Sequence, residues 1–275
     1  MNQTLYRAFR YIFKGVPSVD VRAEISYLNP DAKLAGKRIV ITGGGKGIGK
    51  AIAERFVKEG ADVLIAGRNE KVLNETSVNI GCKYLRLDVS DINSFDKFLS
   101  EAYRVLGGID ILVNNAGISL HENNLFEVTP ETFDSQFNTN FRGPFFLTQN
   151  FIKRNIDANH KASVLFITSE TGDTVDFRPY GLTKSLLNNW VQGIANLFKE
   201  KGIRVNALAP GITASEMTGV KADSNLNAGN YGSGRFYLPE EMAEVACFLC
   251  SDAANIISGQ IITCNNAQTV NARWK

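Results

Sequence analysis

The sequence contains few of the residues from which metal sites and disulfide frameworks are built. Its 275 residues include two histidines and four cysteines. The cysteines lie in apolar surroundings, and a chain of this length needs no disulfide framework. Cys247 and Cys250 form a C-x-x-C pair, but it lies within the apolar run AEVACFLC and has no second pair. We therefore expect core packing rather than metal binding, and a reducing, intracellular location.

Long apolar runs and an excess of one charge are also missing. No apolar run approaches the roughly 18 residues of a membrane span, and the N-terminus lacks the continuous apolar stretch of a signal peptide. The 30 basic side chains nearly balance the 28 acidic ones, so composition gives no indication of nucleic-acid binding. These features predict a cytoplasmic protein that does not bind nucleic acid. The 44% hydrophobic content is enough for a substantial core.

The first 36 residues differ from the rest of the chain. In LYRAFRYIFK, residues 5–14, apolar side chains recur at helical spacing and the basic side chains are offset from them, which predicts a short basic amphipathic helix. Such a helix can cover an apolar patch of its own domain, pack on another subunit, or lie on an anionic membrane surface. We favour the first two interpretations over peripheral membrane contact. Residues 15–36, with Pro17, Pro30 and Gly15, are interpreted as a linker.

From residue 37 the chain alternates short β-branched runs with amphipathic stretches. This pattern predicts an α/β fold, a Rossmann-type doubly wound parallel sheet of seven strands with helices on both faces. The expected strands are residues 38–42, 62–66, 83–87, 109–114, 163–168, 203–209 and 260–264. Residues 212–237 form one long polar stretch, which we interpret as a functional lid.

A glycine-rich turn, TGGGKGIG at residues 42–49, joins the first expected strand to a helix. Gly43, Gly47 and Gly49 allow a tight turn, a close backbone approach to a pyrophosphate and close helix packing. The alternative is a plain glycine turn with no ligand. Its position between an apolar strand and a helix favours dinucleotide binding.

The choice of dinucleotide depends on the end of the second strand. Gly67 occupies the region where a carboxylate would otherwise hold the ribose hydroxyls of NAD, so nothing there repels a 2'-phosphate. Arg68 offers a guanidinium suited to phosphate, and Lys46 in the glycine turn adds a second cation. We therefore expect NADP(H) in preference to NAD(H), although each cation alone is also interpretable as a solvated surface charge.

The stretch YGLTK, residues 180–184, places a tyrosine and a lysine on one helix face. Pro179 suits the first helical position, which puts Tyr180 in the first turn. A neighbouring ammonium on Lys184 and the helix dipole both favour the phenolate, so we expect a lowered Tyr180 pKa and a candidate general acid or base. The alternative is an ordinary helix start.

Seven motifs, in order and at near-family spacing, give the chain a resemblance to the short-chain dehydrogenase/reductases, and among them to 3-oxoacyl-acyl-carrier-protein reductase-like members. They cover about residues 37–270. The motifs are TGGGKGIG (42–49), LDV (87–89), NNAG (114–117), TNFRG (139–143), ITS (167–169), YGLTK (180–184) and APGI (209–212).

The resemblance implies a catalytic set of Asn140, Ser169, Tyr180 and Lys184. Tyr180 would be the general acid in carbonyl reduction and the general base in alcohol oxidation, while Ser169 would hold and polarise the substrate oxygen. Lys184 would lower the Tyr180 pKa and bind the nicotinamide ribose. The backbone carbonyl of Asn140 would hold a water in the proton relay. Pro144, four residues later, supplies an independent reason, because it has no N–H to donate to that carbonyl; the alternative is a mere kink.

The resemblance also implies a set of cofactor-binding residues. Asp88 and Val89 would contact the adenine, residues 115–117 the adenosine ribose and the floor of the site, and Ile212 the nicotinamide carboxamide. Ser215 stands where the family commonly has a threonine, and keeps the hydroxyl. The full expected set is Gly43, Gly45, Lys46, Gly47, Ile48, Gly49, Arg68, Asp88, Val89, Asn115, Ala116, Gly117, Tyr180, Lys184, Pro210, Gly211, Ile212 and Ser215.

Three departures from the family pattern stand out. The interval from Ser169 to Tyr180 is about two residues shorter than usual in the family, so Thr168 offers a substitute hydroxyl. CNNAQT, residues 264–269, replaces the glycine-rich aspartate turn common near the family's C-terminus, which puts the usual tetramer packing in doubt. The N-terminal extension lies outside the resemblance.

These features predict residues 1–36 as an extension and residues 37–275 as one dinucleotide-binding catalytic domain. The loops expected around the pocket are polar, which favours a polar, sugar-like or small hydroxylated carbonyl or alcohol over a steroid, with a β-ketoacyl thioester still open. Residues 186–198 are apolar around much of the helix, so a homodimer or homotetramer is expected. The alternatives are a nucleotide-binding regulator or scaffold without turnover, and an epimerase or dehydratase relative.

Overall fold

The computed structural model describes residues 20, 22 and 32–270. The helix predicted over residues 5–14 lies outside the described residues, as does most of the predicted linker. Leu34, which the sequence analysis assigns to the linker, is fully buried among the helices and strands that follow. The backbone N–H of Lys33 donates to the Glu59 carboxylate at 2.8 Å. The packed domain therefore begins before residue 37.

The predicted seven-stranded parallel sheet is confirmed, with every strand within three residues of its expected limits. The strands lie in the order β3-β2-β1-β4-β5-β6-β7, and each neighbouring pair is parallel. Their bounds are β1 Arg38–Thr42, β2 Asp62–Gly67, β3 Lys83–Arg86, β4 Ile111–Asn114, β5 Ala162–Ile167, β6 Ile203–Pro210 and β7 Ile261–Cys264. The strand order reverses between β1 and β4, where a doubly wound sheet opens a crevice at its carboxyl edge.

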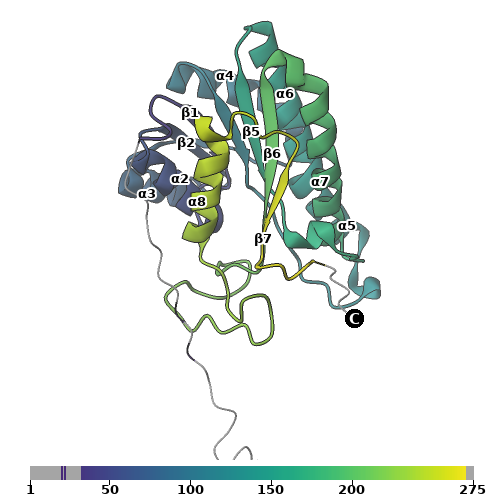
Figure 1. The fold of residues 1–275 in the computed structure, drawn as a ribbon. Coiled ribbons are helices and arrows are strands. Elements are labelled where there is room, and N and C mark those ends of the chain that lie inside the picture. The colour runs from purple at the N-terminus through teal and green to yellow at the C-terminus, as the bar shows by residue number, and fades with distance from the viewer. Residues whose placement is uncertain (1–19, 21, 23–31, 271–275) are drawn as a thin grey trace, which may run out of the picture.

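Helices cover both faces of the sheet (Figure 1). On one face lie α2 (Gly47–Lys58), α3 (Glu70–Ile80) and α8 (Pro239–Cys250); on the other lie α4 (Phe95–Leu106), α6 (Gly143–Asp157) and α7 (Pro179–Phe198). A shorter α5 (Pro130–Phe137) contacts α7. The remaining short helical turns are η1 (Ile92–Ser94), η2 (Leu125–Glu127), η3 (Asn138–Arg142), η4 (Glu170–Asp173), η5 (Lys199–Lys201) and η6 (Asp252–Ala254).

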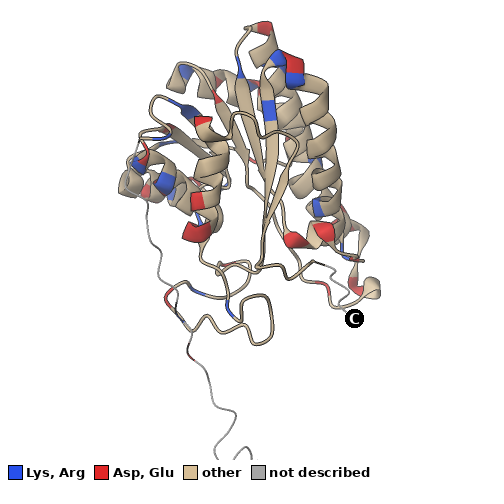
Figure 2. Cartoon of the chain, viewed as in Figure 1, with Lys and Arg blue, Asp and Glu red and all other residues tan. Residues whose placement is uncertain are grey.

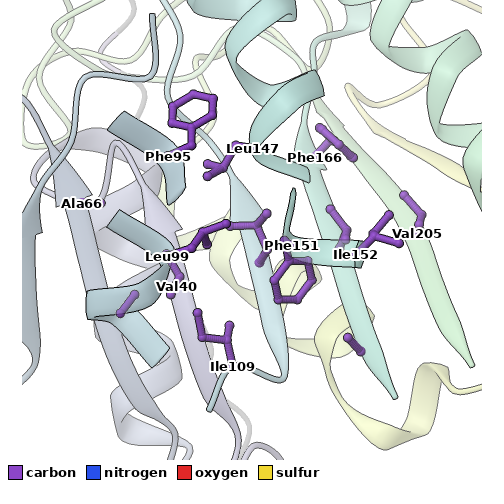
Figure 3. Packing of buried hydrophobic residues seen from close by; sticks show 14 of the residues in the cluster. Val40, Ala66, Phe95, Leu99, Ile109, Leu147, Phe151, Ile152, Phe166 and Val205 are labelled. Atoms are coloured by element: carbon purple, nitrogen blue, oxygen red, sulfur yellow. The ribbon is translucent and has the colours of Figure 1, made fainter. Parts of the chain in front are cut away.

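The two-residue alternation of the strands divides the core into two layers. Val40 of β1 and Leu112 of β4 face the α4–α6–α7 layer, whereas Ile39 and Ile111 face the opposite layer. Figure 3 shows Leu147 and Phe151 of α6 in the first layer, together with Leu99 of α4 and Val40. Because each central strand is buried on both faces, it reads as a continuous apolar run.

The C-x-x-C pair packs as expected. Cys247 and Cys250 of α8 are each 2% exposed and belong to the core layer beneath α2 and α8. Burial raises the pKa of the Cys250 thiol to about 12, which keeps it protonated and unreactive at neutral pH.

The predicted lid, residues 212–237, contains no long helix or strand. Isolated bridges join Thr213 to Tyr237 and Asn227 to Arg235, and a small cluster of Ala214, Leu226 and Leu238 anchors the segment. It loops below the carboxyl edge of the sheet in Figure 1. Figure 2 shows both signs of charge on the visible helices rather than a face of one sign. In the part of the chain that the structure describes, no helix combines the length and apolarity that crossing a membrane requires.

Candidate active site

Two adjoining cavities lie at the carboxyl edge of the sheet. The first, of about 530 Å³, is lined by the glycine turn, the residues after β4 and β5, the start of α7 and the start of the lid. The second, of about 370 Å³, runs from the glycine turn toward the end of β2. It shares five residues with the first: Gly43, Lys46, Ala116, Gly117 and Glu216. Of the residues expected from the sequence, only Asn140 and Gly49 line neither cavity.

The glycine turn has the backbone that a dinucleotide requires. Gly43 and Gly47 have φ angles of +67° and +52°, which residues other than glycine rarely adopt. An added Cβ on Gly49 would overlap the Gly43 carbonyl and the Asn115 amide, so this glycine sets the packing of α2 rather than touching a ligand. The amide of Asn115 donates to the carbonyls of Thr42 and Gly43 at 3.0 and 3.1 Å and holds the turn against β4.

The N-terminus of α2 faces this turn without a side-chain cap. Lys46 stands at the N-cap position, and its side chain makes no capping hydrogen bond. The first backbone N–H groups of the helix are therefore available to an anion, with the positive end of the helix dipole behind them. This donor set, together with the missing Cβ atoms of the turn, fits a dinucleotide pyrophosphate.

The second cavity contains the residues expected at the adenosine end. Asp88 and Val89 line it, as do Gly67 and Arg68. Asp88 accepts hydrogen bonds from the backbone and hydroxyl of Ser90, and these bonds with the nearby Arg68 outweigh burial and lower the pKa of its carboxyl. Arg68 is exposed and forms no ion pair with the described residues.

Lys46 is not a free cation, contrary to what its position in the turn suggested. Its ammonium forms an ion pair with Glu216 of the lid at 2.7 Å, and both side chains are more than half exposed. Glu216 was missed by the sequence analysis because it lies 170 residues from its partner. A phosphate at Lys46 must therefore compete with this carboxylate.

The two hydroxyls expected to act on the substrate oxygen lie together. Ser169 follows β5, and its Oγ accepts hydrogen bonds from the backbone N–H and the hydroxyl of Thr171 at 3.2 and 3.0 Å. Tyr180 is the second residue of α7, after Pro179, and its side chain lines the same cavity as Ser169. Thr168 instead points its hydroxyl toward the Leu208 carbonyl, at 3.4 Å, so Ser169 is the better placed of the two candidates.

The expected lowering of the Tyr180 pKa is wrong. Burial raises the pKa of the phenol, and the nearby Glu170 carboxylate adds to this, whereas the Ser169 hydrogen bond and Arg178 oppose it. The Lys184 ammonium lies over the tyrosine ring, 5.4 Å from its centroid, and donates to the Ile167 carbonyl at 3.0 Å. Burial also lowers the pKa of Lys184, to about 8, which weakens the cation expected to act on the phenol.

Asn140 lies in a π-helical turn, η3, at the junction of α5 and α6. The backbone N–H of Gly143 donates to the Asn138 carbonyl, five residues back, and Pro144 has no N–H with which to extend the α-helical pattern backward. The Asn140 amide bonds the N–H and carbonyl of Ile118, both at 2.8 Å, and so ties this turn to the loop after β4. Its side chain is thus fully used in positioning.

Thr42 is a positioning residue that the sequence analysis missed. Its hydroxyl accepts hydrogen bonds from the backbone N–H groups of Asn115 and Ala116, both at 3.1 Å. The signal was present in the sequence, because a threonine at the end of a strand can accept from the loop of the next strand at the same sheet edge.

Known proteins with this sequence pattern and fold are numerous. The family described as "Enoyl-(Acyl carrier protein) reductase" matches residues 43–266. A 3-oxoacyl-[acyl-carrier-protein] reductase of Aquifex aeolicus is 31% identical over 86% of this chain and 98% of its own. An L-rhamnose 1-dehydrogenase (NADP(+)) of Thermoplasma acidophilum is 33% identical over 86% of this chain and 97% of its own. The solved 3-ketoacyl-(acyl-carrier-protein) reductase of Brucella melitensis, complexed with NADH, is 30% identical with a TM-score of 0.78, over 86% of this chain and 99% of its own.

The buried Lys184 predicts a pH dependence of stability. Its pKa is about 8 in the folded protein against 10.5 for the ordinary side chain, so the unfolded chain binds more protons between these values. The charged lysine therefore costs stability below pH 8, and the cost is relieved as the pH rises toward 10.5. The test is urea denaturation, without cofactor, of the wild type and of Lys184→Met. We expect the difference between their unfolding free energies, wild type minus variant, to rise by about 2 kcal/mol from about pH 7.5 to 10. A difference that stays flat over this range would contradict the assignment.

Proposed function

We propose that this chain, which belongs to the short-chain dehydrogenase/reductase family, is an NADP(H)-dependent oxidoreductase. It would transfer hydride between the nicotinamide and a carbonyl or secondary alcohol, with Tyr180 as general acid or base. The observation that carries this proposal is the convergence of Ser169, Tyr180 and Lys184 on a cavity that continues to the glycine turn. A cytoplasmic location and a non-nucleic-acid role stay predictions from composition.

When bound, the reduced nicotinamide supplies a hydride to the substrate carbon. Ser169 would donate a hydrogen bond to the substrate oxygen, where negative charge develops as the carbonyl is reduced. Tyr180 would give its proton to that oxygen in reduction and take it back in oxidation. A raised phenol pKa suits the acid role, because the proton is in place at neutral pH. Lys184 would bind the nicotinamide ribose, and the Asn140 carbonyl would hold a water that resupplies the proton.

The relatives support this reaction type without choosing a substrate. Their names include a ketoacyl reductase, a sugar dehydrogenase and a "Gluconate 5-dehydrogenase" of Gluconobacter oxydans, 30% identical over 88% of this chain. All these names describe hydride transfer at a carbon that bears an oxygen. Interconversion of a carbonyl and an alcohol is therefore the reaction we propose.

The preference for NADP(H) rests on Arg68 and Gly67, because Lys46 is paired with Glu216. Removing the Arg68 guanidinium takes away a charge-assisted donor to the 2'-phosphate. We expect Arg68→Ala to weaken NADPH binding by about tenfold and leave NADH binding nearly unchanged, measured by cofactor fluorescence titration. Arg86→Ala, an exposed arginine on β3 that does not line the cavity, is the matched control. Equal binding of NADH and NADPH by the wild type would refute the preference.

Turnover should depend on the phenol rather than on the fold alone. We expect Tyr180→Phe to lower kcat for carbonyl reduction by about a thousandfold while cofactor binding stays within about twofold, because it removes one hydroxyl. Ser169→Ala should also lower kcat, whereas Thr168→Ala should not. Turnover by Tyr180→Phe at the wild-type rate would contradict the assignment of Tyr180 as the general acid or base. Cofactor binding with no turnover of any carbonyl by the wild type would favour a nucleotide-binding scaffold.

We also propose that the chain forms a homodimer or homotetramer through the outer face of α6 and α7. A hollow of about 380 Å³ there is lined by Phe145, Ile152, Trp190 and Leu197 among others, and the Phe145 and Trp190 rings stack at 4.4 Å. Leu197 is 69% exposed in the single chain. Burying this face is favourable only against another apolar surface.

A charge on this face should break the assembly. We expect Leu197→Glu to shift the protein toward monomer in sedimentation equilibrium. Val78→Glu, a 74% exposed position on α3, should leave the mass unchanged. A wild-type protein that sediments as a monomer at the highest concentration tested would rule out the proposed interface.

A further inference from the structure

We propose that Glu170 selects the substrate, so that the enzyme prefers a neutral carbonyl compound with a hydroxyl group on the carbon next to the carbonyl. This inference rests on the proposed function and names the substrate class of the same site. It is carried by the burial of the Glu170 carboxyl, its hydrogen-bond partners and the pairing of the cations in the cavity.

The Glu170 carboxyl is built into the wall of the first cavity. The residue follows Ser169 directly, opens the η4 turn and is only 5% exposed. Its Oε2 accepts a hydrogen bond from the Asn265 amide at 2.9 Å. The second N–H of that amide donates to the Thr269 hydroxyl at 2.9 Å, and Asn265 is itself 2% exposed. One oxygen of the carboxyl is thus held by a fixed donor.

The other oxygen has no such partner. Within the described part of the chain, no hydrogen bond or ion pair reaches Oε1, and it is not among the fully buried oxygens that lack a partner. Oε1 is therefore open to the cavity that the residue lines. A carboxyl oxygen in a largely buried site requires a hydrogen-bond donor, and a substrate hydroxyl is a donor of suitable size.

Two of the cations that line this cavity already have carboxylate partners. Arg178 is bound by both oxygens of Asp176, at 2.9 and 2.8 Å. Lys184 donates to the Ile167 carbonyl, and Lys46 is paired with Glu216. A carboxylate or phosphate on the substrate would thus meet the Glu170 carboxylate, while two of the cations that line the cavity, Lys46 and Arg178, are already paired with carboxylates. Like charges at close range disfavour an anionic substrate.

Glu170 also lies within electrostatic range of the reacting hydroxyls. It follows Ser169 directly and lines the same cavity as Tyr180, and its charge contributes to the raised pKa of the phenol. A substrate oxygen held by Ser169 and Tyr180 would place the neighbouring carbon in the cavity that Glu170 lines. A hydroxyl on that carbon is the group that the free carboxyl oxygen can accept from.

Three small ketones of similar size test this selection. Hydroxyacetone has a hydroxyl next to the carbonyl, butan-2-one replaces it by a methyl, and pyruvate carries a carboxylate there. Reduction of hydroxyacetone adds a hydride from the reduced nicotinamide to the carbonyl carbon and a proton to its oxygen, giving propane-1,2-diol. We measure kcat and KM for each ketone with saturating NADPH, on the full chain, after confirming NADPH binding by fluorescence.

For the wild type we expect kcat/KM for hydroxyacetone to exceed that for butan-2-one by about tenfold or more, with pyruvate the poorest. In Glu170→Gln the hydroxyacetone preference should fall to about threefold or less, mainly through KM, and pyruvate should gain about tenfold relative to butan-2-one. Asp173→Asn removes a carboxylate from the same turn but outside the cavity, so it should keep the wild-type ratios. Asn265→Ala is a second variant, which removes the hydrogen bond to Oε2. It should reduce the preference for hydroxyacetone, and it should raise kcat/KM for pyruvate relative to butan-2-one less than Glu170→Gln does.

The outcomes separate this inference from the proposed function. Loss of NADPH binding in the wild type would overturn both. Four results would overturn the role of Glu170 and leave the reductase proposal standing. They are NADPH binding without turnover of hydroxyacetone, equal kcat/KM for hydroxyacetone and for butan-2-one or pyruvate, a higher kcat/KM for a β-ketoacyl thioester than for hydroxyacetone, and kcat/KM ratios that do not change in Glu170→Gln. Equal loss of all three activities in Glu170→Gln would mark the residue as structural and overturn the selection.

Discussion

The close contact between the glycine turn and the end of β4 is the constraint on which the rest of the site depends. Gly49 leaves no room for a Cβ against the Gly43 carbonyl and the Asn115 amide, and Asn115 in turn bonds the carbonyls of the turn. This contact joins the loops that follow β1 and β4, the two neighbouring strands between which the strand order reverses. It therefore places the uncapped end of α2 beside the loop that Asn140 fixes, and so sets the cofactor end of the site relative to the catalytic end.

Burial, more than pairwise charge, sets the chemistry of the catalytic groups. An ammonium four residues from a phenol on one helix would lower the phenol pKa in water-like surroundings, yet here desolvation acts on both groups in the direction that neutralises them. The phenol therefore stays protonated and can donate its proton. The pKa of Lys184, about 8, lies much closer to neutral pH than that of an ordinary lysine. The nearby Ser169 hydroxyl is then the main influence that opposes the rise in the pKa of the phenol.

What could be predicted from the sequence was local or periodic. The strands followed from β-branched runs, and Tyr180, Ser169 and Lys184 came from short motifs at strand ends and helix starts, which the sheet brings to one edge. Contacts between distant segments were not readable in this way. Glu216 meets Lys46 across 170 residues, and Asn265 meets Glu170 across 95. Neither pair has a periodic signal, and the sign of the Tyr180 pKa shift depended on burial that only the packed structure supplies.

Two consecutive residues of the lid contact two different loops of the site. Glu216 pairs with Lys46 of the glycine turn, and the carbonyl of Met217 lies 2.9 Å from Nε2 of His121, in the loop after β4. His121 has a φ angle of +57°, a conformation that a non-glycine residue adopts only when its surroundings hold it there. Because the two contacts are adjacent in the chain, displacing the start of the lid breaks both together. The start of the lid therefore joins the glycine turn, at the phosphate end of the cavity, to the loop after β4 at its substrate end.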